Sequence, residues 1–235
     1  SGQSGGDFSF GVNTAENLMN SSKSIDMGLQ YLFNVDELST LLINALPMGV
    51  KVNSKATVLA ETSVRDDMVY AIIKKFANDF DQILLIGEGS FIKKIVEDGK
   101  ELHDIDWSRL NIHFITGEEG IAENYRTYLA NLIGVNDLDD KKSRFIMSSM
   151  GVAELDLNIF HETREAVHIR RLAHNDSALR EALFGKQNFC PMLFVYYPHR
   201  CFVEALPSNM GQAELAISMI SPEMKIPLLR YRSGD

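Results

Sequence analysis

The stretch Gln82-Ile83-Leu84-Leu85-Ile86-Gly87 sets the fold class, because its apolar side chains would point to both faces of an extended segment. A strand of this kind is covered on both sides, as in a parallel sheet flanked by helices. A helix is expected next, from Ser90 to Glu97, and the run Asn111-Ile112-His113-Phe114-Ile115-Thr116 predicts a second buried strand. This strand–helix–strand order indicates an α/β fold.

Similar patterns flank this unit on both sides. The apolar run Leu41-Leu42-Ile43-Asn44-Ala45-Leu46 ends at Pro47, and another strand is predicted over residues 143–148. Apolar residues at helical spacing predict helices over 26–33, 66–80 and 122–133. We therefore expect residues 1–185 to form an α/β subdomain with a mostly parallel sheet flanked by helices.

The character of the chain changes after Gly151. Residues 161–184 are rich in arginine and are predicted to be helical. Short strands are predicted over residues 192–197, 200–206 and 213–220. We expect residues 186–235 to form an appended antiparallel β subdomain, with the boundary near residue 185.

Composition narrows the class of protein. The chain has 23 Lys and Arg against 32 Asp and Glu, which gives a net charge of −9. A nucleic-acid-binding face needs clustered basic residues, so the charge argues against a nucleic-acid-binding protein. No apolar run approaches the roughly 18 residues of a membrane span. The two cysteines, Cys190 and Cys201, are too few for a disulfide framework, so a cytoplasmic protein is expected. The start at Ser1 and the end at Asp235 suggest a segment of a longer protein.

Two glycine-rich stretches are candidates for binding phosphate. Gly87-Glu88-Gly89 follows a predicted strand and matches half of a dinucleotide fingerprint, although Ile92 stands where the third glycine would be. Ser1-Gly2-Gln3-Ser4-Gly5-Gly6 offers converging backbone N–H groups and hydroxyl donors, without the lysine of a Walker loop. The second stretch is the better phosphate loop, and a Rossmann-type oxidoreductase stays open as an alternative.

Two acidic residues are candidates for the chemistry. Glu154, three residues after Gly151, would hold Mg²⁺, which takes one or two carboxylates together with substrate phosphates. It is equally consistent with a solvated glutamate at the start of a helix. The carboxylate of Asp235 would accept hydrogen bonds from two sugar hydroxyls, or would lie in an ordinary turn.

Taken in order, these segments resemble the adenylate-forming acyl- and aryl-CoA ligases. The resemblance is to the branch that contains phenylacetate–CoA ligase, the capsule-biosynthesis homologues and the acyl-protein synthetases. The segments that carry it are Ser1-Gly2-Gln3-Ser4-Gly5-Gly6, Gly117-Glu118-Glu119-Gly120 with Glu123 and Arg126, Met150-Gly151-Val152-Ala153-Glu154, Ala213-Glu214-Leu215-Ala216-Ile217, and Tyr231-Arg232-Ser233-Gly234-Asp235.

The resemblance implies a reaction in two steps. A carboxylic acid attacks the α-phosphate of ATP to give an acyl-adenylate and pyrophosphate, and the acyl group then passes to CoA or another acceptor, such as a carrier protein. ATP and Mg²⁺ are the implied cofactors, and Glu154 is the implied catalytic and metal-binding residue. The other implied site residues are Ser1, Gly2, Ser4, Gly5 and Gly6 for the phosphates, Gly117, Glu118 and Gly151 for the adenine side, and Asp235 for the ribose.

The sequence also departs from the family pattern. No lysine follows the phosphate loop, Met150 replaces the tyrosine that stacks on adenine, and Ala153 replaces a threonine. The family's mobile C-terminal domain, which supplies a catalytic lysine, would begin after Asp235, so little or no adenylation is expected from these residues alone. A non-catalytic homologue that acts as a binding or scaffold protein is the alternative.

Three further groups of residues have a plain and a functional interpretation. The first group is expected to be ordinary surface or core residues, with a zinc site as the alternative. It consists of His161, His168, His174, Cys190, His199 and Cys201. A solvated helix face, with a contact to anionic CoA or a carrier protein as the alternative, is expected of Arg164, Arg170, Arg171 and Arg180. Core filling, with an acyl pocket as the alternative, is expected of Met48, Met147 and Met150.

Overall fold

The computed structural model describes residues 12, 14–47, 50–140, 142–152, 154–207, 213–220, 226 and 228–232. The helices are α1 (Ala15–Phe33), α2 (Asp66–Phe76), α3 (Gly89–Glu101), α4 (Glu123–Leu132), α5 (Arg164–Asn175) and α6 (Ser177–Phe184), with a 3₁₀ turn at Trp107–Arg109. The strands are β1 (Thr40–Asn44), β2 (Val58–Glu61), β3 (Gln82–Glu88), β4 (Ile112–Gly117), β5 (Ile146–Val152), β6 (Asp156–His161), β7 (Val195–Tyr196), β8 (Cys201–Leu206), β9 (Glu214–Met219) and β10 (Tyr231–Arg232).

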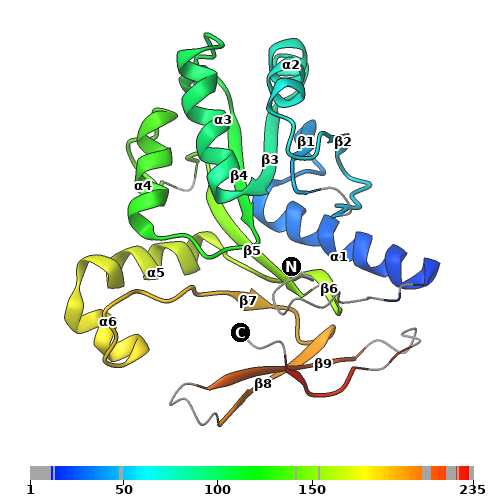
Figure 1. Cartoon of the computed structure of the whole chain (residues 1–235), viewed down its shortest axis with the longest axis vertical. Coiled ribbons are helices and arrows are strands. Elements are labelled where there is room, and N and C mark those ends of the chain that lie inside the picture. The colour runs from blue at the N-terminus through cyan, green and yellow to red at the C-terminus, as the bar shows by residue number, and fades with distance from the viewer. Residues whose placement is uncertain are drawn as a thin grey trace.

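The described strands form two sheets (Figure 1). The larger has the order β2-β1-β3-β4-β5-β6-β7, and the smaller has the order β10-β9-β8. Neighbouring strands from β2 through to β5 are parallel, whereas β6 pairs antiparallel with both β5 and β7. All pairs in the smaller sheet are antiparallel. The predicted α/β class is therefore confirmed, including the mostly parallel sheet and the separate antiparallel one.

The central strands are apolar on both faces because helices cover both faces of the sheet. Ile83 and Leu85 of β3 lie in a core that includes side chains of α2, α3 and α4. Leu84 and Ile86 point to the other face and pack with residues of α1 and α5. Successive side chains of a strand point to opposite sides, so a continuous apolar run fills two cores at once.

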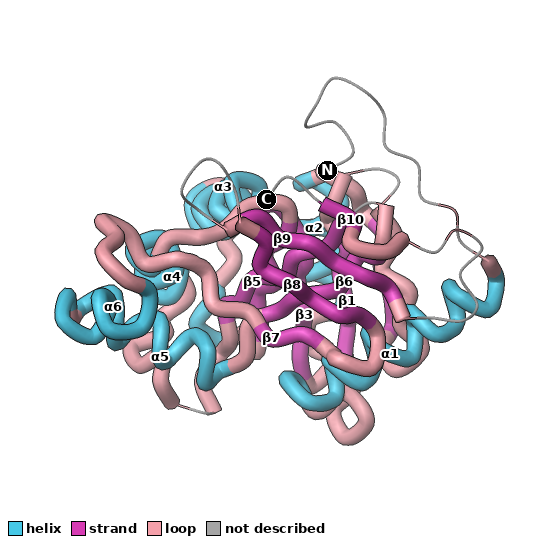
Figure 2. Tube along the Cα trace, turned by 90° about the horizontal axis from the view of Figure 1, so that it is seen from below, coloured by secondary structure: helices cyan, strands magenta, loops and turns pink. Residues whose placement is uncertain are grey.

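The smaller sheet packs against the β5–β6 hairpin. Its inner side chains include Cys201, Ile217 and Met219, which form a third core with Val152 and Leu155. Seen from below, β8, β9 and β10 lie across the strands of the larger sheet (Figure 2). This packing brings β10, which precedes the predicted ribose-binding residue Asp235, close to the end of β5.

Several predicted boundaries are wrong. Helix α1 starts at Ala15 rather than at residue 26. Thr14 caps this start, because its hydroxyl oxygen accepts a hydrogen bond from the N–H of Asn17 at 3.0 Å. Helix α2 ends at Phe76 rather than at residue 80. The region 161–184 is not one helix, because His161 ends β6 and Asp176 separates α5 from α6.

The C-terminal strands also differ from the prediction. The strand expected over 192–197 is reduced to β7 and pairs with β6 in the larger sheet. The smaller sheet therefore begins at Cys201, later than the expected boundary near residue 185, and the division into domains stays a prediction. Strands β2 and β6 were not predicted.

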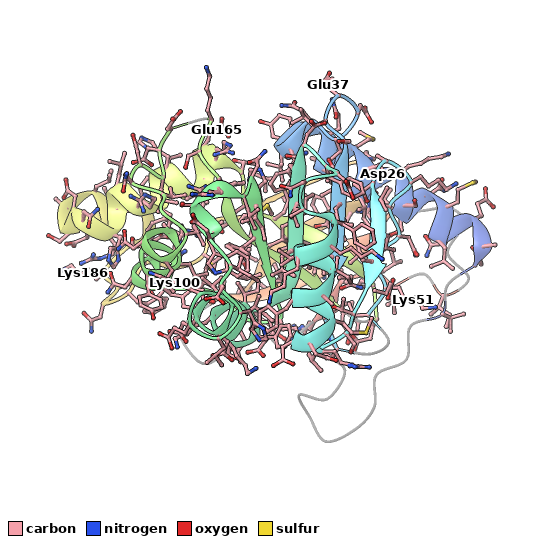
Figure 3. The ribbon with its side chains drawn as sticks, turned by 90° about the horizontal axis from the view of Figure 1, so that it is seen from above. Asp26, Glu37, Lys51, Lys100, Glu165 and Lys186 are labelled. Carbon is pink, nitrogen blue, oxygen red and sulfur yellow. The ribbon has the colours of Figure 1, made fainter. Side chains whose placement is uncertain are left out.

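Helix α1 is tied to the segment that leads into β2. Asp26, labelled in Figure 3, accepts hydrogen bonds from the hydroxyl of Ser54 at 2.6 Å and from the N–H of Lys55 at 3.1 Å. These contacts fix the helix over the second face of the sheet. None of the helices in the described part of the chain combines the length and apolar character needed to cross a membrane.

Candidate functional site at the carboxyl edge of β4 and β5

Two predicted site segments leave neighbouring parallel strands at the same edge of the sheet. Thr116 of β4 is paired with Ser148 of β5. Gly117 is the last residue of β4 and Glu118 follows it, and Gly151 lies three residues beyond Ser148. The predicted adenine loop, residues 117–120, therefore leaves the sheet beside Ser148, from which β5 runs on to Gly151 and to the turn that contains Glu154. This is the edge at which ligands bind in open α/β sheets.

The backbone of the 117–120 loop is strained at Glu118. This residue has a φ of 71°, a region that residues other than glycine rarely adopt. The N–H of Glu119 donates to the carbonyl oxygen of Gly117 at 2.9 Å, which closes a tight turn around Glu118. Strained residues of this kind cost about 1–3 kcal/mol and gather at functional sites, where the surrounding structure holds them.

The strand predicted over residues 143–148 ends later in the structure, beyond Ser148. Strand β5 continues to Val152, so Met150 and Gly151 belong to it, and its register against β6 shifts between Met150 and Val152. Such bulges redirect side chains and are common beside active sites. Glu154 then lies in the turn between β5 and β6, so the interpretation as a helix-start glutamate is wrong.

Glu154 is joined to the second sheet through Tyr231. Burial raises the pKa of Tyr231, and so does its side-chain hydrogen bond with the carboxylate of Glu154. Tyr231 pairs with Ile217 of β9, and its ring packs against the third core. Two of the segments that carry the family resemblance are therefore in direct contact.

Beneath this edge lies a buried group of charged residues. Arg126 and Glu162 are fully buried, and Glu123 and Arg170 are each only 3% exposed. Arg126 pairs with Glu123 at 3.0 Å and with Glu162 at 2.9 Å. Burial opposes the charge of Arg126, but the two carboxylates outweigh it and raise the pKa of the guanidinium.

This group corrects the prediction for Arg170, which was expected on a solvated helix face. Its guanidinium instead contacts Glu123 at 2.5 Å. The spacing of Glu123 and Arg126, three residues apart on a predicted helix, is a local signal for their pairing. The role of Glu162 was not predicted, because its partners lie on α4 and α5 and no local sequence pattern indicates these contacts.

Four of the six histidines and cysteines considered for zinc have separate surroundings. His168 contacts Asp139 at 2.9 Å, and His174 contacts Asn124 at 3.1 Å. Cys201 is in the third core, and the thiol of Cys190 lies 3.5 Å from the carbonyl oxygen of Arg170. Across the described residues, no three His, Cys, Asp or Glu side chains gather into a metal-binding group.

The remaining candidates are distributed as follows. Glu88 accepts a hydrogen bond from the N–H of Ser90, so a carboxylate caps the helix start at which a dinucleotide phosphate would bind. Met147 is in the core beneath α1. Outside the described residues lie the predicted site residues Ser1, Gly2, Ser4, Gly5, Gly6 and Asp235, together with Met48 and Ala153.

Comparison with known proteins identifies the fold. No family model matches the sequence, and no curated protein matches it either. An open conformation of 2-hydroxyisobutyryl-CoA ligase, in complex with 2-HIB-AMP and CoA, matches with a TM-score of 0.58 and 9% identity over 91% of this chain and 46% of that one. The same ligase in its thioesterification state matches with a TM-score of 0.59 and 11% identity, over 100% of this chain and 46% of the ligase.

A long-chain-fatty-acid–CoA ligase from Archaeoglobus fulgidus gives a TM-score of 0.48 and 12% identity over 85% of this chain and 38% of that one. The two matches to 2-hydroxyisobutyryl-CoA ligase show that the chain has the fold of part of that ligase, and the chain spans 46% of its length.

Proposed function

We propose that the chain is the nucleotide-binding part of an enzyme that activates a carboxylic acid with ATP. The observation that carries this proposal is the hydrogen bond between Tyr231 and Glu154, which joins two segments of the family resemblance. The fold supports it, since 2-hydroxyisobutyryl-CoA ligase is seen with an acyl-adenylate and CoA in the same architecture. The acid would become an acyl-adenylate, and pyrophosphate would leave.

The residues at this edge suit such a ligand. The 117–120 loop and the bulged end of β5 would face the adenine, and Ser1, Gly2, Ser4, Gly5 and Gly6 would bind the phosphates. Catalysis would then rest on positioning and on stabilisation of charge, because no side chain here needs to form a covalent bond.

Mg²⁺ fits the donor set at Glu154. Glu154 is partly exposed in the β5–β6 turn, and its carboxylate is the kind of hard oxygen donor that Mg²⁺ prefers. Tyr231 would orient this carboxylate through its hydroxyl. When bound, the ion would neutralise charge on the phosphates of ATP.

The finer assignment follows the sequence resemblance. It points to the phenylacetate–CoA ligase branch, to CoA or an acyl-carrier protein as the acceptor, and to a cytoplasmic location. Met150 offers a thioether where the family places an aromatic ring on the adenine, so weaker nucleotide binding is expected than in an enzyme with that ring.

Carboxylate-dependent exchange between pyrophosphate and ATP tests the proposal, using the intact protein and a panel of aliphatic and aromatic acids. Exchange that requires one class of acid is the expected result. ATP binding without exchange for any acid would favour the non-catalytic scaffold, and binding of a nicotinamide cofactor in place of ATP would favour an oxidoreductase.

A further inference from the structure

The buried charges beneath the site connect the backbone of three segments. Arg126 donates to the carbonyl oxygen of Ile146 in β5, as well as to Glu123 and Glu162. Glu162 in turn accepts from the N–H of Ser148 at 2.8 Å. The strand that leads to Gly151 is thereby held from below by an ion pair that solvent does not reach.

Arg170 holds the other two segments. One terminal nitrogen donates to Glu123, and the other donates to the carbonyl oxygens of Ile121 at 2.7 Å and Cys190 at 3.2 Å. Its Nε donates to the carbonyl oxygen of Pro191 at 2.9 Å. Each nitrogen of the guanidinium therefore has a partner. A planar fork with donors in several fixed directions is specific to arginine, and lysine cannot reproduce it.

The segments that Arg170 joins also touch one another. A Cβ atom placed on Gly120 would lie 3.1 Å from the Cγ of Met192, so the loop after β4 and the segment after Cys190 are closely packed. Ile121 directly follows this loop, in which Glu118 has the strained φ of 71°. A backbone in such a conformation persists when neighbouring contacts fix both of its ends.

A contribution to stability alone does not explain the arrangement. Burying paired charges costs desolvation, and apolar side chains of similar volume often replace such pairs without loss. The position of the group, directly under two site segments, indicates a role in setting their geometry.

We propose that Arg170 is a positioning residue that holds the nucleotide-facing 117–122 loop against residues 190–192. The inference rests on the proposed function for the meaning of the loop, but not for the contacts themselves. It makes α5 the support of the adenine side of the site, although α5 contributes no side chain to the ligand in this scheme.

Arg170→Lys is the main test, since the ammonium group can still pair with Glu123 while the three carbonyl oxygens lose their common donor. Hydrogen exchange followed by mass spectrometry should show roughly tenfold faster exchange in residues 117–122 and 190–192, with α2 and α3 unchanged. In pyrophosphate exchange, the KM for ATP should rise about tenfold while kcat at saturating ATP changes less than threefold. Arg170→Met should show the same pattern more strongly.

Arg164→Met is the matched control. Arg164 is on the same helix, but it stacks on Phe145 and donates to the carbonyl oxygen of Ser143, away from the loop. Unchanged exchange in 117–122 and 190–192 of Arg170→Lys, or an increase spread evenly over the chain, would overturn the proposal. Absence of all ATP-dependent activity in the intact protein would refute the proposed function, while hydrogen exchange would still decide the role of Arg170.

Discussion

The side chains of Tyr231 and Glu154 are hydrogen-bonded, and through this contact the last described strand is fastened to the turn after β5. Burial of the hydroxyl and this hydrogen bond both raise the pKa of Tyr231, so the phenol is the protonated donor at neutral pH. A carboxylate held in this way has less freedom to lose when a ligand binds. The contact therefore links the smaller sheet to the proposed nucleotide site.

Tyr231→Phe should weaken binding of Mg²⁺–ATP about fivefold, because a hydrogen bond of about 1 kcal/mol no longer orients Glu154. The ring stays against the third core, so the free energy of unfolding should change by about 1 kcal/mol or less. Calorimetric titration and urea unfolding measure the two effects.

Tyr196→Phe is the control for that experiment. Tyr196, on β7, packs its ring against Phe160 of β6. It should leave ATP binding unchanged. Equal effects of the two substitutions would mean that Tyr231 does not act through Glu154.

Glu154→Gln should lower the rate of pyrophosphate exchange roughly 100-fold, because the amide has nearly the same shape but no charge for Mg²⁺. The loss should be partly recovered at high Mg²⁺ concentration. Titration of the exchange rate with Mg²⁺ measures this, and an unchanged Mg²⁺ requirement would show that another group holds the ion.

Glu118→Gly and Glu118→Ala form a matched pair, since both remove the carboxylate but only glycine relieves the positive φ. Relief of about 1–3 kcal/mol of strain, less the entropy cost of glycine, should make Glu118→Gly about 1 kcal/mol more stable than Glu118→Ala. Thermal unfolding of the two variants checks this. A glycine variant that is the less stable of the two would contradict a strained loop.

His113 should make the protein less stable in acid. It is buried in β4, where its Nδ1 accepts from the N–H of Phe145 at 2.8 Å, and burial, together with the charges of Arg164 and Arg144, lowers its pKa to about 3. Below pH 6.5 the unfolded chain binds a proton that the folded chain does not, so the free energy of unfolding falls by up to about 1.4 kcal/mol per pH unit until about pH 3. Above pH 6.5 this group adds no pH dependence.

His113→Gln separates this titration from that of other groups, because its amide oxygen can accept from Phe145 but takes up no proton. Urea unfolding between pH 6.5 and pH 5 should give a shallower pH dependence for the variant than for the parent protein. Identical slopes would mean that His113 is protonated in the folded state.

The central strands could be predicted from the sequence because each carries its own signal. Leu41 to Ile43 and Ile83 to Ile86 are apolar at every position, and both faces are buried under helices. Strand β2 lacks that signal, since it is short and lies at an edge of the sheet. Its formation depends on the neighbouring strand more than on its own residues.

The site could be predicted in part for the same reason. Glycine and glutamate after a buried strand are visible in the sequence, as at Gly117 and Glu118. The burial of Arg170 could not be predicted from the sequence, because its partner Glu123 is 47 residues earlier in the chain. An arginine-rich helix looks solvated until the elements that pack on it are known, and only the fold supplies them.

Photolabelling with 8-azido-ATP tests most directly the claim that ATP binds at the carboxyl edge of β4 and β5. The reactive group is on the adenine, so labelling of the intact protein, followed by peptide mapping, reports which segment faces the base. Labelled peptides should contain residues 117–122 or 146–154, and unlabelled ATP should suppress the labelling. Suppressible labelling at Gly87–Gly89 instead, or labelling that ATP does not suppress, would contradict the proposed site.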